Sequence, residues 1–377
     1  MEKQDFSNIV IVGAGSAGTR AAYQLIKKLD HTKFNLIVIN PRPYHILYPA
    51  TARVIVSDRD NLKDRIFVPI EDILKGKGRF VLGKVTKIEP DKKEAGGGTV
   101  LVSNGETISY RFLVLSPGVS WDNPLRFPEG LNGLDAYLAS DRQSFEKAEK
   151  IVLVGAGAVG CELAGELRDI YPDKELTIVH GDTLPLNNFY PEKLRKAVRN
   201  NVEKRNIKLL LDEYIDTIPN ADEKITEVTT RSGKAIKADL VVSTRGQRPN
   251  TELIQETFGM EALTSRGLVK IEATFQLPGH RNIFVIGDVV DWNEQKQSLK
   301  ANAHADIAVT NILSLLNGRT SLKKYTGSLE LLVLTNGRNG GVTYIHLFGG
   351  ITLGNWFTRL GKSRSLAVPI LRAHVGL

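Results

Sequence analysis

Two glycine-rich stretches in this chain have the residue types and spacing to bind phosphates. Each carries glycines at the first, third and sixth positions. The first stretch comprises Gly13, Ala14, Gly15, Ser16, Ala17 and Gly18, and the second contains Gly155, Gly157 and Gly160. In such a turn the first glycine permits a tight bend, the second lets backbone approach a pyrophosphate, and the third allows close helix–strand packing. Two turns of this kind predict two bound dinucleotides, with electrons passing between them.

Strand–helix–strand units must position both turns. We expect a strand at 8–12, a helix at 15–29 and a strand at 34–39, then strands at 151–155 and 176–180 around the second turn. Each helix would aim its N-terminal N–H groups and its dipole at a pyrophosphate. The pattern predicts an α/β fold with two Rossmann-like dinucleotide-binding domains.

In many such units an acidic residue ends the second strand and binds the adenosine ribose. Both units of this chain have another residue type at that position. These residues are Asn40 and His180. Asn40 can still accept a hydrogen bond from ribose. Because His180 is not an acid and would not repel a 2′-phosphate, the second unit could bind either NADH or NADPH. Glu162, in the first turn of the second helix, could contact ribose or nicotinamide, or could simply stabilise the helix dipole.

The loop from Pro41 to Arg53 gathers aromatic, histidine and arginine side chains beside the first unit. Tyr44, His45 and Tyr48 could wall a flavin or a quinone, or could pack on the sheet edge. Arg53 follows this loop, and its cation could face the pyrophosphate.

Two later turns place further candidate cofactor-binding residues at the ends of strands. Gly118 ends a strand in a Pro-Gly turn, where backbone could approach a cofactor. Gly287 and Asp288 end another strand, at the edge where open α/β sheets bind ligands, and the Asp288 carboxylate could accept hydrogen bonds from ribityl hydroxyls. A helix over roughly 299–316 would aim its N-terminal dipole at a flavin.

Composition is that of a globular enzyme. The chain has 377 residues, 42% of them hydrophobic and 24% charged, and it contains no apolar run long enough to span a bilayer. The N-terminus predicts no signal peptide or transit peptide, and Glu2 predicts no N-myristoylation. Cys161 is the single cysteine, which excludes a redox-active cysteine pair and a structural disulfide within the chain. We expect it to be a small buried residue.

The order of these parts resembles the two-dinucleotide flavoprotein oxidoreductases over residues 8–316. The matching motifs are GAGSAG, SPG, GAGAVGCE, TRGQRPN and VIGDVVD. TNGRNGGV (335–342) and LGKSRSLAV (360–368) look like the apoptosis-inducing-factor-like subgroup, which includes ferroptosis suppressor proteins. Those proteins are FAD-dependent NAD(P)H oxidoreductases that reduce quinones.

The resemblance implies a set of site residues. FAD would be held by the first glycine turn, Arg53, the backbone near Val85, and Asp288. NAD(P)H would be held by the second turn, Glu162 and Gly246. Lys362 falls in a motif that lies near the flavin and quinone in the subgroup. Lys362, His45 and Tyr44 are the candidate groups to orient or protonate the quinone. His304 is a further candidate, although its position favours a packed or exposed histidine.

The domain division expected from this resemblance is discontinuous. Residues 1–120 and 240–325 would form the FAD domain, and 121–239 the inserted NAD(P) domain. A small C-terminal α+β region, 326–377, would follow.

Charge distinguishes the C-terminal region. The chain has a net charge of +8, and no acidic residue follows Glu330. The cations of this region are Arg338, Arg359, Lys362, Arg364 and Arg372. Apolar residues interleaved with them would suit an anionic membrane surface, where a lipid-soluble quinone resides, or could form an ordinary core. We expect a cytoplasmic location, with peripheral association to mitochondrial or other intracellular membranes as one hypothesis. Two alternatives use the same charge: weak, non-specific nucleic-acid binding, and electron transfer to an acidic iron–sulfur protein.

Overall fold

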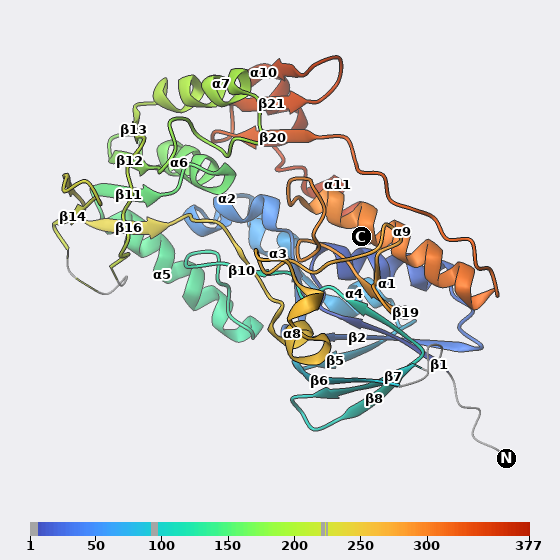
Figure 1. Ribbon diagram of the computed structural model, residues 1–377. Helices are drawn as coiled ribbons and strands as arrows, with labels where there is room; N and C mark the ends of the chain where they lie inside the picture. Colours follow the sequence, from blue (N-terminus) through green and yellow to red (C-terminus); the bar gives the residue numbers. More distant parts are fainter. Residues whose placement is uncertain (1–6, 92–96, 220–222, 224) are drawn as a thin grey trace.

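The computed structural model describes residues 7–91, 97–219, 223 and 225–377. Two mainly parallel sheets form its frame, and a third, smaller sheet lies at the C-terminus (Figure 1). The first sheet has the order β18-β19-β9-β1-β2-β5. Its strands are β1 (Ser7–Val12), β2 (Phe34–Asn40), β5 (Arg79–Leu82), β9 (Phe112–Leu115), β18 (Gln276–Leu277) and β19 (His280–Val285).

The first glycine turn lies between β1 and helix α1 (Ser16–Lys28), as predicted. The last four residues of β1 are buried, which fits a parallel strand covered on both faces. Helix α9 (Ser298–Leu316) packs along α1 and confirms the predicted late helix.

The second sheet has the order β13-β12-β11-β16 and is parallel throughout. Its strands are β11 (Lys150–Val154), β12 (Glu175–Val179), β13 (Ile207–Leu210) and β16 (Leu240–Ser243), and helix α6 (Ala158–Ile170) follows the second glycine turn. The chain was predicted to return to the first unit at residue 240, and this boundary is wrong because one more strand belongs to the second unit. Residues 240–243 pair with β11, so the chain leaves the second sheet only after Ser243.

Shorter elements connect these sheets. Antiparallel strands β6 (Val85–Pro90), β7 (Gly98–Val102) and β8 (Thr107–Tyr110) form a small sheet below the first one (Figure 1). The other paired strands are β3 (Tyr44–Ile46) with β4 (Phe67–Pro69), β10 (Val119–Ser120) with β17 (Arg248–Pro249), and β14 (Glu227–Thr229) with β15 (Ala235–Lys237). The remaining α-helices of these two units are α2 (Thr51–Val56), α3 (Leu62–Ile66), α4 (Ile70–Leu74), α5 (Leu134–Lys147), α7 (Glu192–Glu203) and α8 (Glu252–Phe258).

The C-terminal region is α+β, as predicted. Antiparallel strands β20 (Leu331–Thr335), β21 (Gly341–Ile345) and β22 (Ile351–Leu353) lie beside α7 (Figure 1). They are followed by α10 (Asn355–Thr358), one π-helical turn (Arg359–Ser363) and α11 (Val368–His374).

One hydrophobic core joins the second unit to both of its neighbours. It includes Cys161 and Leu163 of α6, Val54 of α2, and Leu334 and Val368 of the C-terminal region. Cys161 is buried as expected, and burial raises the pKa of its thiol to about 12.

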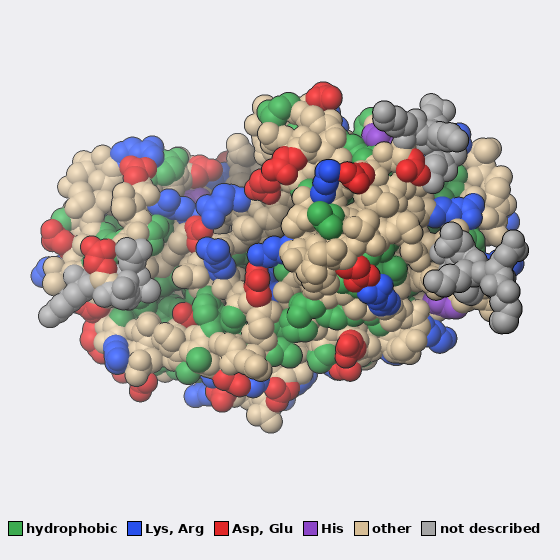
Figure 2. All heavy atoms as spheres, turned by 90° about the horizontal axis from the view of Figure 1, so that it is seen from below, with side chains coloured by type: hydrophobic (Ala, Val, Ile, Leu, Met, Phe, Trp, Pro, Cys, Tyr) green, Lys and Arg blue, Asp and Glu red, His purple; other side chains and the backbone are tan. Residues whose placement is uncertain are grey.

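The surface seen from below the molecule carries Lys and Arg side chains beside Asp and Glu side chains (Figure 2). In the part of the chain that the structure describes, no helix has both the length and the apolar character needed to cross a membrane.

Candidate functional site

The first glycine turn is shaped by close backbone approaches. Gly13 has a φ of +97°, and a Cβ there would lie 2.2 Å from the Ser116 carbonyl oxygen. A Cβ at Gly18 would lie 1.9 Å from the Gly13 carbonyl oxygen, whereas a Cβ at Gly15 would meet no atom within 4 Å. The first and third glycines are therefore required by packing. The second faces open space, where a pyrophosphate could approach.

Two polar side chains hold this turn. The Ser116 hydroxyl lies 3.0 Å from both the Val12 and Gly13 carbonyl oxygens. Asn40 Oδ1 accepts a hydrogen bond from the Ala14 N–H at 2.9 Å, and its Nδ2 donates to the Arg42 carbonyl. Asn40 thus fastens the turn to the end of β2.

The second turn repeats this construction with other residues. Gly155 has a φ of +126°, and a Cβ at Gly160 would lie 1.9 Å from the Gly155 carbonyl oxygen. Gly157 faces open space in the same way as Gly15. The Thr244 hydroxyl donates to the Gly155 carbonyl at 2.8 Å, and His180 Nδ1 accepts from the Ala156 N–H at 3.2 Å.

Ser116 and Thr244 were missed by the sequence analysis. Each follows the strand that returns beside the first strand of its unit, so superimposing the two repeats would have found them.

A hollow of about 530 Å³ lies beyond the ends of β2 and β5. It is lined by Pro41, Pro43, Leu82, Gly83, Lys84, Ser103, Glu129 and Gly130. Val85, the backbone position expected near FAD, directly follows this lining. The hollow has room for the adenosine end of a dinucleotide whose pyrophosphate lies on the first turn. Its lining and the open Gly15 fit that cofactor.

The predicted turn at Gly287 and Asp288 lies beside the first unit. Gly287 has a φ of +88°, and a Cβ there would lie 3.2 Å from the Ala17 side chain of α1. Burial raises the pKa of Asp288, while the nearby charge of Lys296 and a hydrogen bond from Gln247 act to lower it. The structure therefore brings Asp288 to the first glycine turn.

Gly118 and Gly246 flank the strands that connect the two units. Gly118 has a φ of +67°, and its carbonyl accepts a hydrogen bond from the Asn250 N–H at 3.0 Å. Gly246 is exposed, and a Cβ there would meet no atom within 4 Å. Both positions leave room for a ligand.

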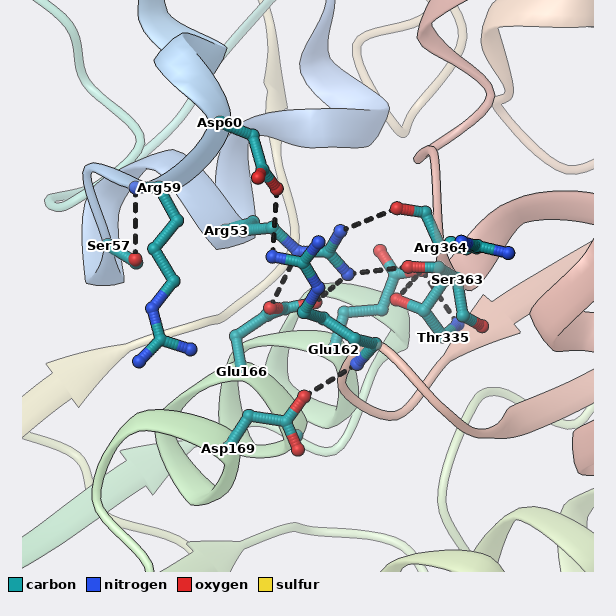
Figure 3. Close-up of polar contacts among 12 residues, drawn as sticks. Arg53, Ser57, Arg59, Asp60, Glu162, Glu166, Asp169, Thr335, Ser363 and Arg364 are labelled. Carbon is teal, nitrogen blue, oxygen red and sulfur yellow. Dashed lines mark hydrogen bonds and ion pairs between the residues drawn. The ribbon is translucent and has the colours of Figure 1, made fainter.

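Arg53 does not stand free to bind a pyrophosphate. Its guanidinium forms a buried two-point ion pair with Glu166 of α6, with both N–O distances 2.9 Å (Figure 3). It also donates to the carbonyls of Ser363 and Arg364. The predicted pyrophosphate contact is therefore corrected, because Arg53 joins α2, α6 and the C-terminal region. Its partner Glu166 was not predicted.

Tyr44 and His45 are packed inside the protein, each only 1% exposed. The Tyr44 hydroxyl donates to the Pro128 carbonyl, and burial raises its pKa to about 12. His45 Nδ1 lies 2.9 Å from the Ala14 carbonyl oxygen, and burial lowers its pKa to about 4. These environments do not support their predicted roles as proton donors to a substrate. Tyr48 stacks on Trp121 at a ring-centroid distance of 6.3 Å.

Glu162 and Lys362, predicted separately, lie together. Lys362 Nζ is 2.6 Å from Glu162 Oε1, which also accepts from the Thr335 N–H at 3.0 Å. Figure 3 shows Glu162 and Thr335 facing each other between α6 and the C-terminal sheet. The second turn is thereby linked directly to the C-terminal region.

Comparison with known proteins identifies the family. Residues 7–307 match the model of the pyridine nucleotide-disulphide oxidoreductase family, and the chain belongs to that family. An FAD-dependent oxidoreductase from Flammulina velutipes is 41% identical over 326 residues, covering 86% of this chain and 99% of the relative. Ferroptosis suppressor protein 1 from Taeniopygia guttata is 31% identical over 367 residues, covering 96% of this chain and 93% of the relative.

Solved structures show the same fold. A sulfide:quinone oxidoreductase from Aquifex aeolicus superimposes with a TM-score of 0.74 at 17% identity, covering 96% of this chain and 92% of that one. A ferredoxin reductase from Rhodopseudomonas palustris has a TM-score of 0.69 at 18% identity, covering 93% and 91%. The chain is an FAD-dependent NAD(P)H oxidoreductase of the two-dinucleotide fold.

Proposed function

We propose that this member of the pyridine nucleotide-disulphide oxidoreductase family is an NAD(P)H:quinone oxidoreductase. When bound, FAD would accept a hydride from NAD(P)H and supply electrons to a quinone. The resemblance to ferroptosis suppressor proteins implies this acceptor. With Cys161 as its only cysteine, the chain cannot use the cysteine pair by which flavoproteins reduce disulfides.

We assign FAD to the first unit and NAD(P)H to the second. Gly15 and the 530 Å³ hollow support the FAD assignment, together with the adjacent Asp288. In the second unit we assign the nucleotide to Gly157, Glu162 and Gly246; Gly157 and Gly246 both face open space. In this proposal residues 1–120 and 244–325 form the FAD domain, 121–243 the NAD(P) domain, and 326–377 the C-terminal region.

The Glu162–Lys362 pair is proposed to act where the two ligands meet. It links α6, just beyond its first turn, to the C-terminal region, and only 12% of the Glu162 side chain and 13% of the Lys362 side chain are exposed. Lys362 Nζ is a positive group that can orient a quinone oxygen, while its bond to Glu162 fixes its position.

The C-terminal surface is the observation that carries the quinone assignment. Large apolar side chains are exposed there: Leu347, Phe348, Ile351, Trp356, Phe357, Leu360 and Ile370. Leu366, Val368 and Leu371, which the sequence could not separate from them, are core residues. Trp356 is 74% exposed and Leu360 64%. Exposed aromatic and aliphatic groups beside cations, with no acid after Glu330, suit an anionic bilayer that holds the quinone.

A stopped-flow experiment tests the acceptor. The flavin is reduced anaerobically with NADH or NADPH, then mixed with a short-chain ubiquinone or with a small iron–sulfur protein. We expect rapid reoxidation by the quinone and slow reoxidation by the iron–sulfur protein. The opposite order would select the iron–sulfur alternative.

Liposome co-sedimentation tests the surface. We expect the double variant Trp356→Glu and Leu360→Glu to lose binding to vesicles containing phosphatidylserine. Met260→Glu is the matched control, since Met260 is 67% exposed but lies in the first unit. Equal binding by both variants would remove membrane docking from the proposal.

A further inference from the structure

A buried histidine lies directly behind the turn that carries Asp288. His304 belongs to α9, and its side chain is only 2% exposed. Its ring packs against Phe275 and Tyr325, at ring-centroid distances of 4.5 and 5.0 Å. These contacts hold the imidazole in one place.

Both ring nitrogens of His304 have partners. The Gly287 N–H donates to Nδ1 at 3.3 Å, and Nε2 lies 2.7 Å from Glu294 Oε1. Since Nδ1 accepts, the proton of the neutral ring is on Nε2, which donates to Glu294.

Glu294 and Tyr325 hold the His304 ring from the side of its Nε2 atom. Glu294 Oε2 accepts a hydrogen bond from the Tyr325 hydroxyl at 2.9 Å, and the Glu294 side chain is 6% exposed. Burial raises the pKa of Glu294, but the hydrogen bonds from His304 and Tyr325 and the charge of Lys300 act the other way and leave that pKa below its ordinary value. Glu294 is therefore a carboxylate that accepts from both neighbours, which fixes the tautomer of His304.

The Gly287 N–H needs this acceptor because the turn is buried. Gly287 has a φ of +88° and packs close to Ala17 of the first glycine turn. A buried N–H without an acceptor is unfavourable, so loss of the Nδ1 contact would favour another conformation of the turn. Any such change would move Asp288, the next residue.

We propose that His304 is a positioning residue for the flavin. Its Nδ1 holds the Gly287–Asp288 turn in the conformation that receives FAD, while Glu294 and Tyr325 hold the ring. The inference rests on the assignment of FAD to the first unit and is independent of the electron acceptor.

Two substitutions test the roles of the two ring nitrogens of His304 separately. In His304→Asn, an amide oxygen can take the place of Nδ1 and still accept from the Gly287 N–H. In His304→Gln, the longer amide can keep a contact with Glu294 but leaves that N–H without its acceptor. The dissociation constant of FAD is measured for each apoprotein by quenching of flavin fluorescence.

We expect His304→Gln to weaken FAD binding by about tenfold or more and His304→Asn to stay within about 1.5-fold of the parent. The visible circular dichroism of bound flavin should change in His304→Gln and be restored in His304→Asn, which general destabilisation would not produce. Equal affinities for the two variants would overturn the proposal.

Tyr325→Phe gives an independent test should His304→Gln fail to fold. It leaves His304 in place and removes one hydrogen bond to Glu294. We expect FAD binding to weaken by about threefold, with an altered flavin circular dichroism. Parent-like affinity and circular dichroism would contradict the proposed role. Neither readout involves a quinone, so failure here is distinguishable from failure of the acceptor assignment.

Discussion

The two glycine turns are built alike, but they differ in what their strand-end residues leave unused. Asn40 and His180 each accept from the alanine N–H inside their turn. The Asn40 amide also donates within its own unit, to the Arg42 carbonyl. His180 Nε2 is buried and has no hydrogen-bond partner among the residues that the structure describes. The strand-end residue of the first unit thus uses both of its polar side-chain atoms, whereas that of the second unit leaves one ring nitrogen enclosed.

The helices after the turns differ as well. Helix α1 is tied through Arg20 to Asp306, whose side chain is 43% exposed. Helix α6 is tied through Glu166 to Arg53, and both side chains are at most 5% exposed. The ion pair that anchors α6 is therefore more deeply buried than the one that anchors α1.

The largest expected effect comes from breaking the buried pair. Glu166→Ala leaves the Arg53 guanidinium buried without its carboxylate, which should cost about 3–5 kcal/mol of unfolding free energy. Asp306→Ala removes a partly exposed partner and should cost under about 1 kcal/mol. Urea unfolding of both variants measures the difference, and similar losses would show that the two helices are held equally.

His45 of the first unit should make the stability of the protein depend on pH. Burial lowers the pKa of His45 to about 4 in the folded protein, against an ordinary value near 6.5. The unfolded chain therefore binds the proton more readily, and stability is lost as pH falls from about 6.5 to about 4. The loss is of the order of 3 kcal/mol.

Unfolding free energies across this pH range test the effect. His45→Asn keeps a donor toward the Ala14 carbonyl and should flatten the profile over this interval. An unchanged slope would mean that other groups govern it.

Substitution of the third glycine of each turn should affect only the ligand assigned to that unit. A Cβ at either position would lie 1.9 Å from a carbonyl oxygen, an overpacking of about 1–3 kcal/mol. We expect Gly18→Ala to lose FAD on gel filtration. Gly160→Ala should keep FAD but should be reduced by NADH about tenfold more slowly or worse. Loss of flavin from Gly160→Ala would contradict the assignment of ligands to units.

The smallest expected effect concerns the choice of coenzyme. His180→Asp keeps an acceptor for the Ala156 N–H but places a carboxylate near the adenosine ribose. It should lower kcat/KM for NADPH about tenfold relative to NADH, by repulsion of the 2′-phosphate. His180→Asn copies the residue of the first unit and should leave the ratio within about threefold. A matching loss for both coenzymes in His180→Asp would place His180 away from the ribose.

The repeated turns were predictable because their glycines act over a few residues of sequence. Both strand–helix–strand units were confirmed to within one or two residues. Ser116 and Thr244 were also within reach, as equivalent positions of the two repeats.

The remaining contacts were not predictable because they join distant segments. Arg53 meets a carboxylate 113 residues away, and Glu162 pairs with Lys362, 200 residues away. Tyr44 and His45 have the residue types of a catalytic pair, and only tertiary burial shows that they are packed. In the C-terminal region, core Leu366 and exposed Leu360 are the same residue type six positions apart, so sequence could not separate them.

Anaerobic titration of the purified protein with NADH, after extensive dialysis, tests the central claim most directly. One unit should retain its dinucleotide while the other exchanges it. We predict about one FAD per chain, no retained NAD(P)H, and full bleaching of the flavin by about one equivalent of NADH. Two retained flavins per chain, or a flavin that NADH does not bleach, would contradict the account.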